Sequence, residues 1–173
     1  EQILLLERAL FAVGKANNVE AKEADVETSL NIAKSIDMLC EEKGMCLSER
    51  ASLSSELDRI KSWGSIDVDS IEKLRLDGVK LSLYEMPKTE YERLKEETTA
   101  LLLEETKASV KAMALVCPEA QLSSFNGYRL ALPQLSTENM RKEITELTSL
   151  ISAAQEKISS YGQYSDALKE AIK

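Results

Sequence analysis

Cys40, Cys46 and Cys117 are the most reactive side chains of the sequence. A zinc site or a redox pair would use thiols at close spacing such as Cys-x-x-Cys, often with histidine as a further ligand. Cys40 and Cys46 are six positions apart, which turns them away from each other on a helix, and the sequence contains no histidine. The spacing therefore favours free buried thiols in a reducing cytosol over a disulfide or a metal site.

Carboxylates are the other candidates for chemistry, because two of them held close together can act as acid and base. Asp67 with Asp69 and Glu104 with Glu105 are such pairs, but among 30 acidic residues pairs of this kind arise by chance. The missing histidine also removes the commonest general base. The sequence has no glycine-rich phosphate loop and no calcium loop. It thus predicts a protein that is not an enzyme by itself and that has no metal and no cofactor.

The overall charge indicates protein partners. The 173 residues carry a formal net charge of -8, and only 5% of them are aromatic. An acidic surface repels nucleic acid and anionic lipid, and the sequence lacks a run of about eighteen apolar residues that could span a membrane. We therefore expect no nucleic acid, no direct membrane contact and partners with basic surfaces. Because the sequence begins at Glu1 in the middle of a helical pattern, we also expect a piece of a longer protein.

Two long helical patterns frame the chain. Residues 1–62 and 136–173 carry apolar residues at alternating spacings of three and four, as a coiled-coil seam does. Gly14, Asn17 and Asn18 weaken the first pattern, so we expect a helix throughout with a kink near residues 14–18. The second pattern opens with an N-cap at Ser136 and is expected to run to the last residue. Since one region joins them, the two helices should pair antiparallel.

The first helix is longer than the second helix can cover. Its N-terminal end would leave an apolar patch in water, formed by Ile3, Leu4, Leu5, Leu6, Leu10, Phe11 and Val13. Exposing so large a patch is unfavourable. We therefore expect this end either to fold back near residues 14–18 or to self-associate with a second chain.

Residues 63–135, between the two helices, predict a small α/β lobe. Runs with the period of a strand occur at residues 79–86, 98–103, 108–116 and 128–132, with short helical segments after Pro87 and Pro118. The order strand, helix, strand, strand, helix, strand is that of a ferredoxin-like lobe. The predicted fold class is α+β, a long antiparallel two-helix coiled-coil hairpin capped by this lobe. Its three parts are the first helix at 1–62, the lobe at 63–135 and the returning helix at 136–173.

The alternation in residues 79–86 assigns side chains to two faces of a strand. The apolar set is predicted to point toward the helices of the lobe, together with alternate residues of the run at 108–116: Val79, Leu81, Leu83, Val110, Ala112 and Val116. Lys80, Ser82 and Tyr84 would form the outer row, which is either an ordinary solvent-facing surface or a partner-binding one. We take these three as candidate partner-binding residues.

Glycines, prolines and one tryptophan punctuate the expected junctions between elements. Glycine is favoured just past a helix end, and proline at the start of a helix. These structural junction residues are Trp63, Gly64, Gly78, Pro87, Gly127 and Pro133.

Residues 63–94, WGSIDVDSIEKLRLDGVKLSLYEMPKTEYERL, resemble a passage in subunit I of bacterial and archaeal V-type ATPases, the counterpart of eukaryotic subunit a. In that family a long helix ends in Trp-Gly, a short helix ends in Gly, and a strand finishes in an aromatic residue and a proline. The stretch from Gly127 to Pro133, followed by Ser136-Thr137-Glu138, resembles the family's entry into the returning helix. The resemblance covers most of residues 62–150.

The resemblance implies that this chain is part of the soluble N-terminal half of subunit I, the hairpin with its distal lobe. It implies a non-catalytic stator component on the cytoplasmic side of the membrane, in a membrane-bound complex, that links the peripheral stalks to the membrane sector and supports proton or ion transport. The implied partner is the peripheral-stalk heterodimer. The residues alone leave two alternatives open. One is an unrelated coiled-coil adaptor or tether with an α/β interaction lobe, and the other is a regulatory module that binds a small ligand.

Overall fold

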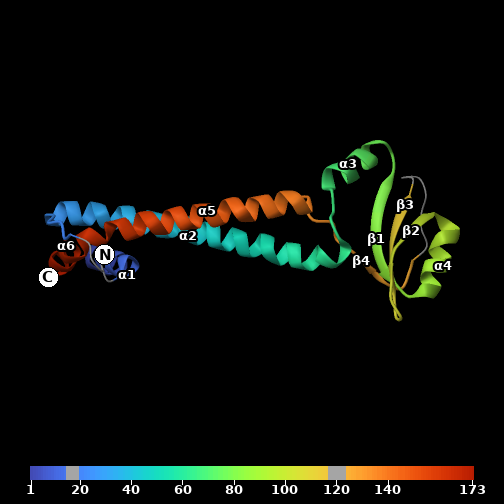
Figure 1. Ribbon diagram of the computed structural model, residues 1–173, viewed down its shortest axis with the longest axis horizontal. Coiled ribbons are helices and arrows are strands. Elements are labelled where there is room, and N and C mark those ends of the chain that lie inside the picture. Colours follow the sequence, from blue (N-terminus) through green and yellow to red (C-terminus); the bar gives the residue numbers. More distant parts are fainter. Residues whose placement is uncertain (15–19, 117–123) are drawn as a thin grey trace. The chain divides into compact units, whose positions relative to one another are not determined.

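The computed structural model describes residues 1–14, 20–116 and 124–173. It divides into two compact units: residues 1–59 with 140–173 form the helical unit, and residues 60–139 form the lobe. Figure 1 shows long helices in the first unit and a small sheet in the second. The predicted α+β fold class, a long helical hairpin with a small four-stranded antiparallel sheet, is confirmed.

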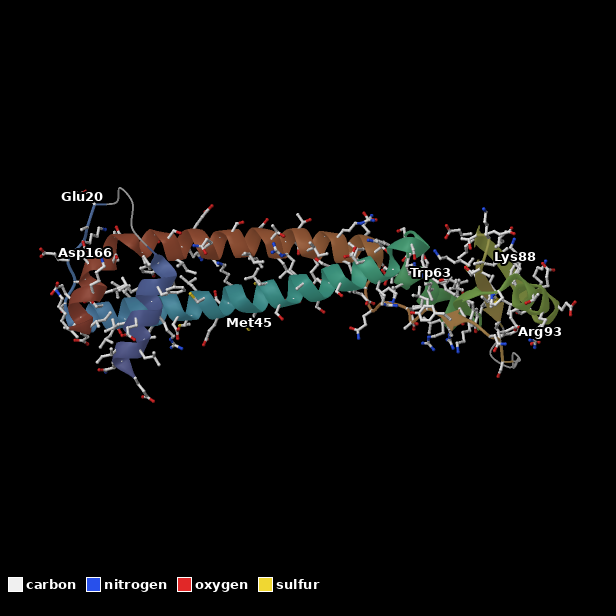
Figure 2. All side chains as sticks on the ribbon, turned by 90° about the horizontal axis from the view of Figure 1, so that it is seen from below. Glu20, Met45, Trp63, Lys88, Arg93 and Asp166 are labelled. Carbon is white, nitrogen blue, oxygen red and sulfur yellow. The ribbon has the colours of Figure 1, made fainter. Side chains whose placement is uncertain are left out.

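The helical unit is built around α2 (Val26–Ile60) and α5 (Thr137–Ser160), which run antiparallel (Figure 1). Figure 2 shows the same pair from another side, with Met45 on α2. Polar side chains bridge the two helices: Lys43 Nζ donates to Gln155 Oε1 (2.6 Å), and Arg50 Nη1 donates to Thr148 Oγ1 (3.3 Å). The middle of the hairpin is therefore joined by hydrogen bonds as well as by apolar packing.

The first helical pattern is divided into two helices, so the prediction of one helix over residues 1–62 is wrong. α1 (Gln2–Val13) ends at Gly14, whose φ is 72°. Residues 20–25 are not helical, and residues 15–19, where most of the predicted kink falls, lie outside the described part. α2 begins after Asp25, whose Oδ1 accepts a hydrogen bond from Thr28 N (2.8 Å). A cap of this kind starts a new helix.

α1 folds back onto the helical unit, the first of the two outcomes expected for the N-terminal apolar patch. Leu6 and Ala9 lie in one buried cluster with residues of the other three helices: Ala33, Ile36, Ile158 and Leu168. Arg8 Nη2 also donates to Asp37 Oδ2 on α2 (3.0 Å). The fold-back covers one side of α1, because Ile3, Leu4 and Phe11 remain exposed.

The second helical pattern also changes direction, so its prediction as one helix to the last residue is wrong. A 3₁₀ turn, Tyr161–Tyr164, separates α5 from α6 (Ser165–Ile172). Gln163 O in this turn accepts a hydrogen bond from Lys22 N (2.8 Å). The turn brings α6 against α1, where Leu168 completes the buried cluster. Apolar spacing predicted helical structure before and after the turn, but as one helix without the break.

The lobe contains a four-stranded antiparallel sheet in the order β2-β3-β1-β4. Its strands are β1 (Lys80–Met86), β2 (Thr99–Glu105), β3 (Val110–Val116) and β4 (Tyr128–Arg129). α3 (Val68–Leu76) precedes β1, and α4 (Lys88–Glu97) connects β1 to β2. The order is that of a split βαβ arrangement, as predicted. The helix expected after Pro118 falls mainly on residues 117–123, outside the described part, and residues 124–127 are not helical.

The side chains of β1 point the opposite way from the prediction. Val110, Ala112 and Val116 of β3 do pack with Leu94 of α4, as expected. The pairing register, however, sets Ser82, Tyr84 and Met86 beside them on this face, and Leu81 and Leu83 on the other. α3 also contacts β1, and Ser82 and Leu83 are both buried. Because both faces of the strand are covered, polarity could not show which one meets α4.

The neck of the lobe is closed by hydrogen bonds between the points where the chain enters and leaves it. Ile66 N donates to Thr137 Oγ1 (2.8 Å), and Thr137 N donates to Ile66 O (2.9 Å). Two residues later, Val68 N donates to Ser136 Oγ (2.9 Å). Ile66, Ser136 and Thr137 are all buried. The hydroxyl of Ser136, predicted as an N-cap, thus fastens the entering chain.

Gly127 lies where only a glycine fits. A Cβ at this position would meet Glu85 O at 2.6 Å and the Cβ of Met86 at 2.9 Å, both on β1. Tyr128 then pairs with Glu85, so the close approach lets β4 join the sheet edge. Gly127 is therefore needed for strand pairing, whereas the sequence suggested a helix end.

The hydroxyl of Thr137 is predicted to contribute strongly to the stability of the lobe. Thr137→Val keeps the shape of the side chain but leaves the buried N–H of Ile66 without its acceptor, which should cost about 1–3 kcal/mol of the free energy of unfolding. Urea unfolding measures the loss. Thr145→Val is the control, because the exposed Thr145 Oγ1 donates only to Arg141 O within α5. Equal losses in the two variants would contradict this role of the neck.

Asp67 predicts a pH dependence of stability. It caps α3, and the hydrogen bond from Ser70 Oγ (2.6 Å), followed by that from the Ser70 backbone, lowers the pKa of its carboxyl from 3.8. Because the folded pKa lies below the unfolded one, the stabilisation is complete above the unfolded pKa and is lost as the pH falls through the folded pKa. Asp67→Asn and Ser70→Ala should each reduce the loss of stability between about pH 6 and pH 2.5. Thermal unfolding measured at each pH gives this loss. The same loss as in wild type would contradict this assignment.

Candidate partner-binding surface

One of the two edge strands of the sheet, β2, carries three consecutive exposed leucines, which we call the leucine edge. Leu101, Leu102 and Leu103 of β2 are each 47–48% exposed. β2 pairs with β3 alone in the described sheet, so its other side is open. An open apolar strand edge is a site where proteins pair with other chains. The leucine edge is therefore the strongest candidate for partner contact in the lobe.

These leucines lie on both faces of the sheet, because successive residues of a strand alternate between its faces. Leu101 is paired with Met113 and Leu102 with Ala112, and the register shifts between Leu102 and Glu104. Ala112 belongs to the face packed by α4, whereas Met113 alternates with it and is only half-buried. The leucine edge is thus apolar on both faces of the sheet. A helix packed on one face would leave the leucines of the other face uncovered.

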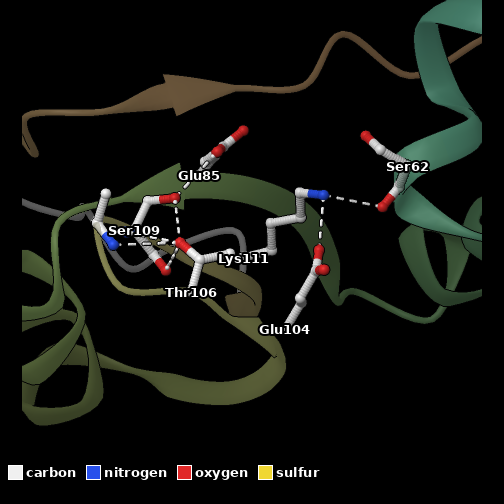
Figure 3. Close-up of polar contacts among 7 residues, drawn as sticks. Ser62, Glu85, Glu104, Thr106, Ser109 and Lys111 are labelled. Carbon is white, nitrogen blue, oxygen red and sulfur yellow. Dashed lines mark hydrogen bonds and ion pairs between the residues drawn. The ribbon is translucent and has the colours of Figure 1, made fainter.

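Beside the leucine edge, Lys111 joins two segments of the lobe (Figure 3). Its Nζ donates to Ser62 O (2.9 Å) and to Glu104 Oε2 (2.7 Å), and it lies 5.4 Å from the centre of the Trp63 ring. The lysine side chain is 13% exposed. An ammonium group that is nearly buried beside an aromatic ring and a carboxylate is well satisfied. It fixes Trp63 against the sheet.

The same residues border a surface hollow of about 370 Å³ together with Gly64 and Leu103. Its charged groups, Lys111 and Glu104, already neutralise each other. The lining also includes Trp63 and Leu103, so the hollow offers apolar contact beside a tryptophan. Aromatic residues at such sites often anchor protein partners.

Polar contacts close the β2–β3 connection next to this hollow (Figure 3). Thr106 Oγ1 accepts from Ser109 N (3.0 Å), and Ser109 Oγ donates to Glu85 Oε1 on β1 (3.1 Å). Lys88 Nζ, at the start of α4, also pairs with Glu105 at the end of β2 (2.5 Å). These contacts hold the end of β2 at which the bulge occurs, so the leucine edge is presented on a fixed strand.

The predicted partner-binding residues do not form a row on the surface. Lys80 is exposed, but Ser82 is 5% exposed and Tyr84 packs against the core beside α4. The structure brings Ser82 and Tyr84 into the interior of the lobe, so their assignment to an outer face is wrong. A partner contact through Lys80 stays a prediction.

Most of the junction residues lie next to ends of elements, and Pro133 lies in the connection between β4 and α5. Trp63 ends a 3₁₀ turn, Lys61–Trp63, and Gly64 follows with φ 80°. Gly78 has φ 86° after α3, Pro87 precedes α4, and Pro133 is buried on the return path. Left-handed conformations such as those of Gly64 and Gly78 explain the choice of glycine.

Two of the three cysteines lie in the described part of the chain. Cys40 and Cys46 are free and half-buried, and burial followed by the charge of Asp37 raises the pKa of the Cys40 thiol. A raised pKa reduces the thiolate that would react or bind metal. Cys117 lies outside the described residues. Within residues 1–14, 20–116 and 124–173, no group of three His, Cys, Asp or Glu side chains could hold a metal ion, and no helix is long and apolar enough to cross a membrane.

Comparison with known proteins gives a likeness of fold. No family model matches the chain, and no curated protein sequence matches it. Among solved structures, the chain is similar to the cytoplasmic N-terminal domain of subunit I, homolog of subunit a, of V-ATPase, with a TM-score of 0.47 and 15% identity. The match covers 98% of this chain and 65% of the other, so the chain spans less than two thirds of that domain. The likeness concerns the fold and assigns no function.

Lys111 predicts a measurable role in holding Trp63. Lys111→Met retains most of the volume but removes the hydrogen bond to Ser62 O and the cation beside the ring, which should cost about 1–2 kcal/mol of the free energy of unfolding. Glu104→Gln keeps an acceptor for Lys111 and should cost less than about 0.5 kcal/mol, because the pair is half-exposed on the Glu104 side. Trp63 is the single tryptophan, so its fluorescence follows unfolding directly. Equal costs for the two variants would count against this role.

Proposed function

We propose that this chain is a stator component of a rotary V-type ATPase, the cytoplasmic part of subunit I that connects the peripheral stalks to the membrane sector. The observation that carries the proposal is the resemblance of residues 63–94 to that family. The junctions of this stretch lie where the resemblance implies: a long helix before Trp63 and Gly64, a short helix before Gly78, and a strand before Pro87.

The mechanics of the fold support such a role. A stator must resist torque without slipping, and paired antiparallel helices transmit force along their packed seam. In this chain the seam is supplemented by the Lys43–Gln155 and Arg50–Thr148 hydrogen bonds. The lobe then serves as a docking surface. Its chemistry is apolar contact, and the ion transport that the complex performs belongs to other parts of it.

The partner in this proposal is the peripheral-stalk heterodimer, on the cytoplasmic side of the membrane. We place the contact at the leucine edge, with the exposed Lys80 as a further candidate. Contact at one of several attachment points need not be strong, because the stalk is held in more than one place. Self-association through the exposed side of α1, which carries Ile3, Leu4 and Phe11, stays a separate prediction.

Titration of the stalk heterodimer of the same organism into the full chain tests the proposal. Leu101→Asp with Leu103→Asp should weaken binding at least about tenfold, because two apolar contacts are replaced by charges. Leu76→Asp is the matched control, since Leu76 is exposed on α3 in the same lobe, away from the leucine edge, and should bind as wild type does. Absence of binding by the wild type, or equal weakening by both variants, would reject the proposal and favour the unrelated adaptor.

A further inference from the structure

One side of the helical hairpin forms a groove between α2 and the end of α5. A hollow of about 300 Å³ lies there. Its lining comes from Ser35, Met38, Leu39 and Glu42 of α2, and from Lys157, Ser160 and Tyr161 of α5 and the following turn. Met38 is 62% exposed. The proposed function makes no use of this feature.

The groove continues toward the middle of the hairpin because residues seven positions apart lie on the same side of a helix. Seven positions from Met38 is Met45, and seven positions from Lys157 is Leu150. These two are 65% and 57% exposed. The apolar rows of both helices therefore extend beyond the hollow without a covering element among the described residues.

The charges along this groove are mostly negative. Lys43 and Arg50, the cations in the middle of α2, point across the seam to Gln155 and Thr148. The rows that border the groove carry Glu42 and Glu49 on α2, and Glu143 two heptads before Lys157 on α5. Lys157 is the cation among the lining residues of the hollow. An apolar floor with an acidic rim follows from this arrangement.

We infer that this groove binds an amphipathic helix with basic flanks from a partner protein, as the third helix of a local bundle. Apolar side chains of the partner would cover Met38, Leu39 and Leu150, while its lysines or arginines would meet Glu42 and Glu49. A helical partner fits this groove because exposed apolar residues recur along two helices at helical spacing, and a third helix can pack along both of them. This inference goes beyond the proposed function, whose partner contact is on the lobe.

Two designed peptides of about 21 residues test the inference. Both carry leucine at the a and d positions of three heptads, one with lysine and its twin with glutamate at e and g. Like charges at e and g keep each peptide from pairing with itself. The full chain should bind the lysine peptide at least about tenfold more tightly than the glutamate peptide, measured by calorimetry, and added salt should reduce the difference.

Variants of the full chain locate the site. Leu150→Lys, and separately Glu42→Lys with Glu49→Lys, should each weaken binding of the lysine peptide at least about tenfold. Phe11→Lys is the control, because Phe11 is an exposed apolar residue of the same unit outside the groove. Circular dichroism verifies that each variant retains its helices. Failure of the lysine peptide to bind, equal binding of the two peptides, or equal weakening by the control would overturn the inference.

Discussion

The pair of hydrogen bonds between Ile66 and Thr137 is the constraint on which the lobe depends. The two residues are 71 positions apart in sequence, yet they exchange backbone and hydroxyl contacts in a buried neck. A buried N–H needs an acceptor. The N–H of Ile66 finds it in the hydroxyl of Thr137, and the N–H of Thr137 finds it in the carbonyl of Ile66. Entry and exit are thereby held together. The sheet and its helices can form as one insertion between two helical segments.

Cationic side chains of both units donate hydrogen bonds within the chain. In the helical unit, Lys43 and Arg50 donate to residues of α5, and in the lobe Lys111 donates to Ser62 and Glu104. The surface also carries exposed apolar side chains, among them Leu101, Leu102 and Leu103. An acidic chain with such surfaces suits partners that carry both apolar and basic residues.

Much of the fold could be predicted from the sequence because apolar spacing identifies single elements. The strands at 80–86 and 110–116, the helix after Pro87 and the ferredoxin-like order were all available in this way. The fold-back near Gly14 was one of two outcomes that the apolar patch predicted. The break at Tyr161 was not predicted, since it depends on α6 packing against α1 around Leu6 and Leu168. The orientation of β1 was missed because both of its faces are buried. The contacts of Lys111 were missed because they join segments that are distant in sequence. The one signal was a lysine placed between Val110 and Ala112 in an otherwise apolar strand.

In the proposed function, this chain is a stator component of a rotary ATPase and connects the peripheral stalks to the membrane sector as part of subunit I. The most direct measurement is to tag the protein at its natural locus, purify it from detergent-solubilised membranes and count the copurifying subunits by quantitative mass spectrometry. The account predicts the peripheral-stalk subunits, the catalytic head and the membrane ring in one complex, with the tagged protein in a fixed ratio to the head. Purification without any subunit of a rotary ATPase would contradict it.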